Sequence, residues 1–232
     1  MKRNKRKIYF AIFWAVLVVS FAFFATVLIL MANGYHLNRG NFTLEKTGML
    51  VINGKENNVL INLNGKVKPA NLPAKYYKLF PGRYDLRITK EGYHGWGESF
   101  DLTGGQAVIL NNIDLYLIDP KVTNQGADEK IINRIKNGFE LQKKQIKIKN
   151  NELWYDAKFV TRFSQPILGA IFDPSTKHFY VQLDREIHAL EQDGGNNTLL
   201  TTLQNSNPVV LSSNDDELQY IENGSSFSVD LW

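Results

Sequence analysis

The sequence contains no cysteine among its 232 residues and only four histidines. Disulfide bonds and thiolate metal sites are therefore excluded, so stability must come from burial of apolar side chains. The histidines are scattered, and no zinc-protease, serine-hydrolase, phosphate-loop or dinucleotide-binding pattern accompanies them. The sequence thus nominates no catalytic residue, metal ligand or cofactor, and we expect a protein that is not an enzyme.

An excess of charge of one sign is also missing outside the first seven residues. The chain has 27 Lys and Arg against 23 Asp and Glu, and five of the basic residues lie within residues 1–7. Residues 8–232 therefore carry 22 basic and 23 acidic side chains, a net charge of −1. Because such a nearly neutral surface lacks the positive field that attracts phosphate, we expect no nucleic-acid partner.

A long apolar run dominates the start of the chain. Residues 8–32 are 25 residues without a charged side chain. At a rise of 1.5 Å per residue, a helix of this length exceeds the hydrocarbon core of a bilayer, which is about 30 Å thick. Basic residues precede the run, and none follows it until Arg39. We therefore expect a single-pass protein of the cell membrane, of a bacterial kind, with residues 1–7 as a cytoplasmic tail and everything after residue 32 extracytoplasmic.

A cleavable signal peptide is the alternative to this retained anchor. Its apolar region would span roughly 7 to 15 residues and end at a small-x-small cleavage site. The run observed here is longer, and it ends in Ile29, Leu30 and Met31 before Ala32. We therefore favour a helix that stays in the membrane.

After a polar linker at residues 33–47, apolar residues recur at every second position. Val59, Ile61 and Leu63 show this period, as do residues 84–89, 100–102 and 113–117. Turn-forming pairs separate these runs, including Asn53-Gly54, Asn64-Gly65, Pro81-Gly82, Glu91-Gly92 and Gly104-Gly105. This pattern predicts a small antiparallel β-sandwich over residues 48–119, with Gly82 in a turn conformation that other residues adopt poorly.

Several motifs in this segment occur in a recognisable order. They are VLINLNG at residues 59–65, Lys-Pro-Ala at 68–70, LFPGRYDLRI at 79–88 and Lys-Glu-Gly-Tyr at 90–93. This order and spacing resemble the PEGA domain. The resemblance implies display at the cell surface or in the periplasm, with carbohydrate or protein partners.

Three aromatic side chains near the last of these motifs have two interpretations. Tyr93, His94 and Trp96 could face a ligand, because exposed aromatic rings stack on sugars. The interpretation we favour is that Tyr93 and Trp96 pack over the edge of the sandwich, with their polar atoms reaching solvent.

The remainder follows a second linker at residues 120–128. Residues 129–139 fit a short amphipathic helix or, equally, a strand and turn; an internal repeat favours the second. Pro166-Ile-Leu recurs as Pro208-Val-Val 42 residues later, and each is followed by a turn and a strand. A four-stranded unit of about 40 residues is typical of β-propeller blades. Residues 129–232 therefore resemble incomplete propeller-like repeats of the TolB-like kind.

The repeats are too few to close a ring. About two and a half blades fit, whereas closed propellers have at least four. We therefore expect an unpaired sheet edge near the end of the sequence, where Phe227, Val229 and Leu231 need cover. Either the chain is truncated, or a partner or the first domain covers this edge.

A loop in the repeats, at residues 191–197, is acidic enough to suggest calcium binding. It lacks the alternating ligands of an EF-hand, so we expect a hairpin turn there.

These features together predict a mainly β protein: a transmembrane helix, a PEGA-like sandwich and propeller-like repeats. The favoured function is a non-catalytic binding or scaffolding module of the cell envelope, with the membrane and cell-surface carbohydrate or envelope proteins as partners. The alternative is an accessory, substrate-gating propeller module of an envelope hydrolase.

Overall fold

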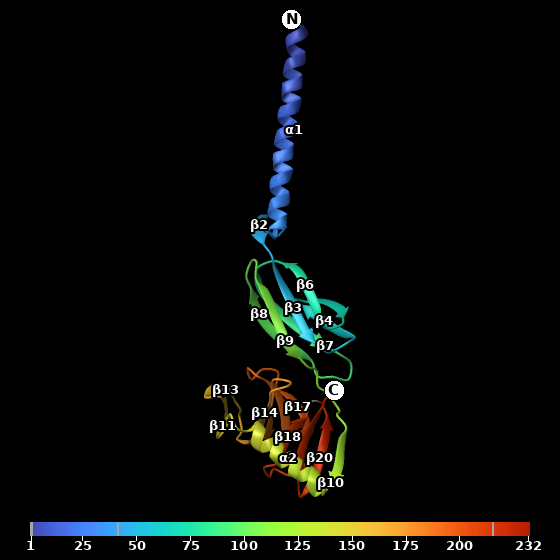
Figure 1. Ribbon diagram of the computed structural model, residues 1–232, viewed down its shortest axis with the longest axis vertical. Helices are drawn as coiled ribbons and strands as arrows, with labels where there is room; N and C mark the ends of the chain where they lie inside the picture. The colour runs from blue at the N-terminus through green and yellow to red at the C-terminus, as the bar shows by residue number, and fades with distance from the viewer. Residues whose placement is uncertain (1, 41, 215) are drawn as a thin grey trace. The chain divides into compact units, whose positions relative to one another are not determined.

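The structure is a computed structural model that describes residues 2–40, 42–214 and 216–232, with the side chains of residues 2–7 left out (Figure 1). The fold is mainly β, with two helices and the strands β1 to β20 in the described part of the chain. The chain divides into two compact units. Unit 1 comprises residues 1–52, 73–84 and 99–110, and unit 2 comprises residues 53–72, 85–98 and 111–232.

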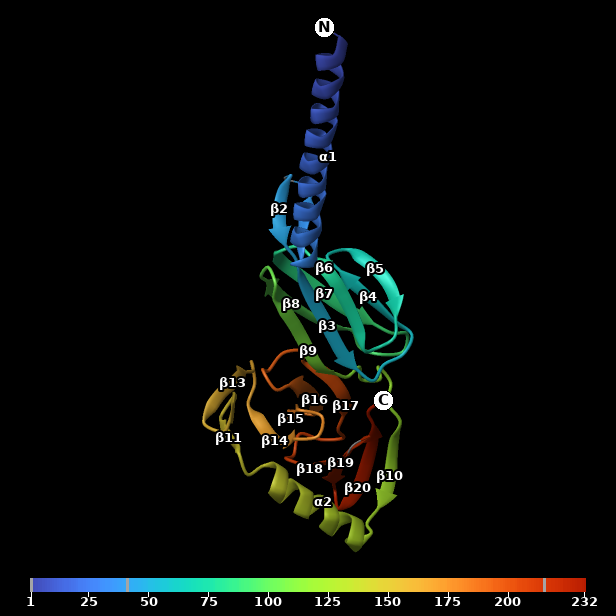
Figure 2. The same ribbon diagram turned by 45° about the horizontal axis from the view of Figure 1, so that its top comes forward.

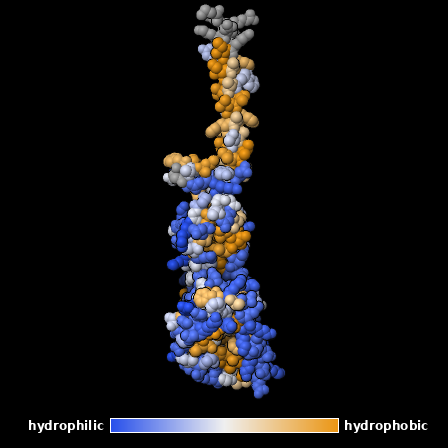
Figure 3. All heavy atoms as spheres, turned by 90° about the vertical axis from the view of Figure 1, so that its left-hand side faces the viewer, coloured by the Kyte–Doolittle hydropathy of each residue, from blue (hydrophilic) through white to orange (hydrophobic). Residues whose placement is uncertain are grey.

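Helix α1 (Lys2–Ala32) in unit 1 confirms the predicted apolar helix. No Gly or Pro interrupts its sequence, so every backbone N–H beyond the first turn can bond within the helix. It ends where Gly34 takes a positive φ of 84° and donates its N–H to the carbonyl of Met31 at 3.0 Å. Its stretch Ile8–Ala32 is long and apolar enough to cross a membrane, and Figure 3 shows its surface as largely hydrophobic.

A hairpin follows the helix where we expected an irregular linker. Strand β1 (Tyr35–Asn38) pairs antiparallel with β2 (Thr43–Lys46). The backbone N–H of Thr47 donates to the carbonyl of Gly34 at 2.9 Å, which closes the base of the hairpin.

Seven strands occupy residues 48–113. They are β3 (Gly48–Gly54), β4 (Val59–Leu63), β5 (Lys66–Ala70), β6 (Ala74–Leu79), β7 (Gly82–Thr89), β8 (Trp96–Leu102) and β9 (Ala107–Ile113). One sheet has the order β6-β3-β9 and the other the order β5-β4-β7-β8. In β4, Val59 and Ile61 are fully buried while Leu60 is exposed, as the period of two predicts.

Two details of this region compare directly with expectation. Gly82 has a φ of +150°, so the special conformation predicted for it is present. The prediction of a strand over residues 113–117 is wrong, because β9 ends at Ile113. Of the residues that follow up to 117, only Leu117 forms a β-bridge, and its partner is Tyr93. The neighbours Leu115 and Tyr116 are both buried, and two consecutive buried side chains do not fit the alternation of a strand with one exposed face.

The rest of unit 2 contains one helix and three further sheets (Figures 1 and 2). The elements are β10 (Val122–Gly126), α2 (Glu129–Gln142), β11 (Ile146–Lys149), β12 (Glu152–Tyr155), β13 (Lys158–Arg162), β14 (Ile167–Asp173), β15 (His178–Leu183), β16 (Glu186–Glu191), β17 (Thr198–Thr202), β18 (Val210–Asn214), β19 (Glu217–Glu222) and β20 (Ser225–Asp230). Their sheets have the orders β11-β12-β13, β14-β15-β16-β17 and β10-β20-β19-β18.

Helix α2 corrects the strand-and-turn interpretation of residues 129–139. The Asp128 side chain caps the helix by accepting the N–H of Lys130 at 2.8 Å, and Ile135 is fully buried. Gly138 lets the helix approach β18 closely, since a Cβ there would lie 2.2 Å from Ser212 Oγ. The cap at Asp128 and the apolar spacing make residues 129–139 helical, and the repeat pattern was misleading for the structure of this segment.

In the middle sheet, β14 to β17, strands β14 to β16 contribute side chains to a core on each face. Tyr180 of β15 belongs to a core shared with the sheet of β18 to β20, whereas its neighbours Phe179 and Val181 belong to a core shared with β11 to β13. Every residue of β15 is buried. The three sheets are therefore stacked, and no closed ring is formed by the part of the chain that the structure describes.

The prediction of an unpaired sheet edge at the end of the sequence is wrong. Strand β20 lies between β19 and β10, and Val229 pairs with Val122. Val229 and Leu231 are buried in the first of the two cores, and Phe227 packs against it. Strand β10 pairs with the edge of β20 that was expected to be open, and β10 lies in the segment expected as a linker between domains. The division into domains itself stays a prediction.

The pair Val229 and Val122 gives a matched test of this arrangement. Val229→Lys should lower the free energy of unfolding by more than about 3 kcal/mol, because it buries an unpaired charge. Val122→Lys should change it by about 0.5 kcal/mol, since Val122 is 43% exposed on an edge strand. Urea unfolding of the full chain in detergent would measure both. Equal effects would contradict the placement of β20 inside the sheet.

Candidate functional site

Two of the three predicted ligand-facing residues line one small pocket in unit 2. His94 and Trp96 lie in its wall together with Asp114, Tyr116 and His178. Trp96 is only 5% exposed, and its indole N–H donates to the carboxylate of Glu191 rather than to solvent. Trp96 therefore cannot offer an open face to a sugar ring in this arrangement.

Tyr93 has a different neighbour. The Nζ of Lys90 lies 4.1 Å from the centroid of its ring, a cation–π contact, and the same ammonium group pairs with Glu56 at 2.6 Å. Tyr93 lies outside the described lining of the pocket.

Buried polar groups lie in the wall of the pocket and behind it. The hydroxyl of Tyr180 interacts with the hydroxyls of Tyr116 and Thr176, whereas His178 Nδ1 has no hydrogen-bond partner within the described part of the chain. A buried polar group left unsatisfied costs about 1 to 3 kcal/mol. The pocket has a volume of about 10 Å³, enough for about one water molecule. We call these four side chains, with Asp114, the polar cluster.

Burial controls the charges in the polar cluster. It lowers the pKa of His178 to about 4, so the imidazole is neutral at pH 7. The His178 Nδ1 lies 3.9 Å from Asp114 Oδ2, and a neutral ring makes this approach a dipolar contact rather than an ion pair. Burial also raises the pKa of Asp114, although the nearby Lys55 partly offsets this effect. The pKa of Glu191 is raised by burial as well.

Two open clefts adjoin the polar cluster. One has a volume of about 390 Å³, shares His178 and Glu191 with the pocket, and adds Asn111, Asn112, Lys177, Gln192 and Asp193. The other has a volume of about 250 Å³, shares Asp114, and adds Asn53, Gly54, Lys55, Asn112, Ser175 and Thr176. Apart from Gly54, every residue in these two linings carries an amide, carboxylate, hydroxyl, imidazole or ammonium group. Such linings can donate and accept hydrogen bonds from many directions, as a ligand rich in hydroxyl groups requires.

Sequence reasoning missed most of these residues because they come from three separate places in the chain, each at or near the end of a strand. Asn111 and Asn112 lie near the end of β9, and Asp114 follows it. Ser175 to Lys177 lie in the β14–β15 turn and His178 begins β15, whereas Glu191 ends β16 and Gln192 and Asp193 lie in the β16–β17 turn. The Asp173 side chain stabilises the β14–β15 turn by accepting both the N–H and the O–H of Ser175. The one feature of the sequence that pointed to this site was the position of two aromatic residues, His94 and Trp96, close to a turn.

The acidic loop at residues 191–197 is a turn, as predicted. Glu191 accepts the N–H of Gly194 at 2.9 Å and donates its own N–H to the carbonyl of Gly195 at 3.1 Å. Among the described residues, no group of three or more His, Asp or Glu side chains is arranged to hold a metal ion.

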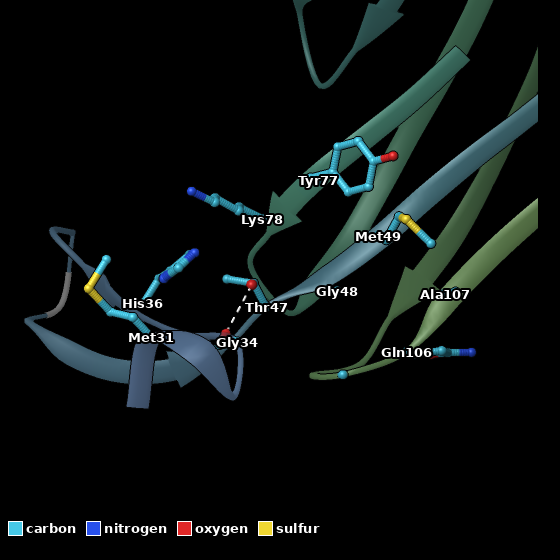
Figure 4. Close-up of a pocket in the computed structure, with 11 residues that line it drawn as sticks. Met31, Gly34, His36, Thr47, Gly48, Met49, Tyr77, Lys78, Gln106 and Ala107 are labelled. Atoms are coloured by element: carbon cyan, nitrogen blue, oxygen red, sulfur yellow. Dashed lines mark hydrogen bonds between the residues drawn. The ribbon is translucent and has the colours of Figure 1, made fainter. Parts of the chain in front are cut away.

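A second hollow lies in unit 1 beside the end of α1 (Figure 4). It has a volume of about 520 Å³, and its lining combines apolar Met31, Met49 and Tyr77 with His36 and Lys78. Figure 4 shows the side chains of His36 and Lys78 in the gap between the hairpin and β6. The Thr47 hydroxyl closes one side by donating to the Gly34 carbonyl at 3.0 Å.

No protein-family model matches the chain, and no curated protein is significantly similar to it in sequence. The resemblances to PEGA domains and TolB-like repeats therefore remain predictions.

The neutral state of His178 predicts how stability depends on pH. In the unfolded chain the imidazole binds a proton near pH 6.5, whereas in the folded protein it does so only near pH 4. Unfolding therefore takes up a proton between these values, and stability should fall as the pH drops from 6.5 to 4, by up to about 3 kcal/mol.

The matched variant is His178→Asn, which keeps a neutral amide at all pH values. Asp114 and Glu191 stay in both proteins, so to first order their own titrations cancel in the comparison. Urea unfolding at pH 7, 5.5 and 4.5 should show the smaller loss in the variant. The same pH dependence in both proteins would contradict a neutral buried His178.

Proposed function

We propose that the protein is a single-pass, membrane-anchored extracytoplasmic module that binds or scaffolds components of the cell envelope and is not itself an enzyme. The observation that carries this proposal is α1. None of its membrane-length stretch is buried against protein, and large side chains such as Phe21 and Val19 are about two thirds exposed or more. Such a surface is stable only in lipid or against another apolar surface.

The proposed fold is a PEGA-like sandwich followed by propeller-like blades. Two sheets, of three and four strands, support the first part. The second part is supported by the stacking of the sheet of β14 to β17 on the sheet that contains β18 to β20. These consecutive groups of strands have the spacing of the sequence repeat, about 40 residues.

The proposed ligands are cell-surface carbohydrate or envelope proteins. The two clefts support a hydroxyl-rich ligand, because polar residues line them and the larger one includes His178, whose buried Nδ1 lacks a hydrogen-bond partner among the described residues. A ligand hydroxyl, or a water molecule that bridges to it, would satisfy this atom.

The orientation can be tested by cysteine labelling, since the native chain has no cysteine. A membrane-impermeant maleimide added to intact bacterial cells, with the outer membrane permeabilised where one is present, should label Lys158→Cys in the exposed strand β13. It should label Lys5→Cys only after the inner membrane is opened. Labelling of Lys5→Cys in intact cells, or release of a fragment that begins near residue 33, would contradict the anchored topology.

A binding test follows from the clefts. Gln192 is an exposed residue of the larger cleft wall, so Gln192→Ala should weaken binding of envelope glycans by about 2- to 10-fold through the loss of a hydrogen bond. Lys158→Ala, outside both linings, is the control. Glycan-array binding of the full chain in detergent would measure both. Binding that responds equally to both changes would contradict this site.

A further inference from the structure

The hairpin of β1 and β2 has one polar and one apolar face. Leu37 pairs directly with Leu44, and these side chains are 56% and 49% exposed. Tyr35 and Lys46 lie on the same face, nearer the base, because side chains alternate along a strand. Phe42, next to the first residue of β2, is 80% exposed. The hairpin therefore presents an apolar surface that the described part of the chain does not cover.

Polar contacts organise the opposite face. The Asn38 amide donates to both carboxylate oxygens of Glu45 at 3.4 Å, and the Thr43 hydroxyl also donates to Glu45. His36 pairs with Glu45 in the register and lines the hollow of Figure 4. This division is specific, because a shift of one residue in pairing would exchange the two faces.

The hairpin is joined to the helix end over a very short distance. Only Asn33 and Gly34 separate α1 from β1. Asn33 donates both its backbone and its side-chain N–H to the carbonyl of Ile29, at 3.0 and 2.8 Å. In Figure 3 the hairpin projects sideways from the end of α1, with hydrophobic atoms on the side turned toward the helix and hydrophilic atoms on the other.

We propose that the apolar face of this hairpin inserts into the boundary between headgroups and acyl chains of the leaflet from which α1 emerges. This inference rests on the proposed membrane anchor. A helix of 25 residues is about 37 Å long, somewhat more than the hydrocarbon core, so its last residues reach this boundary. A hairpin two residues further on lies at the same depth.

The composition of the face supports lipid as its occupant. Leucine and phenylalanine partition into the acyl boundary, and tyrosine is enriched at membrane interfaces. The apolar surface of the hairpin also continues that of α1, whose occupant under the proposed function is lipid. The hairpin would thus act as a second, shallow membrane contact, and it would orient β3, the strand that follows it.

Nitroxide labels at single cysteines test this inference in the full chain reconstituted in lipid nanodiscs. Leu44→Cys lies on the apolar face, and its neighbour Thr43→Cys is a matched control on the polar face. Collision with lipid-soluble oxygen relative to a water-soluble nickel complex reports depth. We expect a several-fold higher ratio for the label at residue 44 than for the label at residue 43.

A third label, at Phe21→Cys in α1, separates the two proposals. If this label is open to water, the anchor itself fails. If it is in lipid while residues 43 and 44 give equal ratios, the anchor stands and the hairpin inference is overturned. Low collision with both reagents at residue 44, with spin–spin broadening between copies, would show a second chain on this face and would also overturn it.

Discussion

The burial of the middle sheet on both faces is the constraint that organises unit 2. A sheet whose two faces are apolar cannot stand alone in water, so β14 to β16, which contribute to a core on each face, need one sheet on each side. Tyr180 and its neighbours Phe179 and Val181 point to opposite cores and hold the register of the whole stack. In the polar cluster, His178 and Tyr180 belong to β15 itself and Thr176 lies in the turn just before it, so the packing of the sheets fixes the positions of these side chains.

Strong periodic signals in the sequence predicted the corresponding elements well. The uncharged run of residues 8–32 could form only a helix of membrane length, and Val59, Ile61 and Leu63 could share a face only in a strand. Weak or competing signals failed. Residues 122–126, Val-Thr-Asn-Gln-Gly, are polar enough for a linker, and they form a strand because β20 offers an unpaired edge. At residues 129–139 a local cap at Asp128 outweighed an apparent repeat.

The polar cluster was out of reach of sequence reasoning for a different reason. Asp114, Thr176 and His178 belong to no spacing motif, and the fold brings Asp114, which follows β9, to the distant β14–β15 turn that holds Thr176 and precedes His178. His94 and Trp96 were singled out as aromatic side chains near a turn. They lie in the pocket wall because Trp96 begins strand β8 and its indole N–H bonds to Glu191. Local patterns report which face of an element is apolar, but they do not report which turns meet.

The pairing of Val122 with Val229 has a consequence for the order of events during synthesis. The two strands are separated by about a hundred residues, so β10 leaves the ribosome long before its partner exists. At roughly 5 to 20 residues per second, β10 waits for about 5 to 20 s. During that time its edge is open and the apolar sheets beside it are incomplete, so this strand is exposed to wrong pairing until β20 has been made.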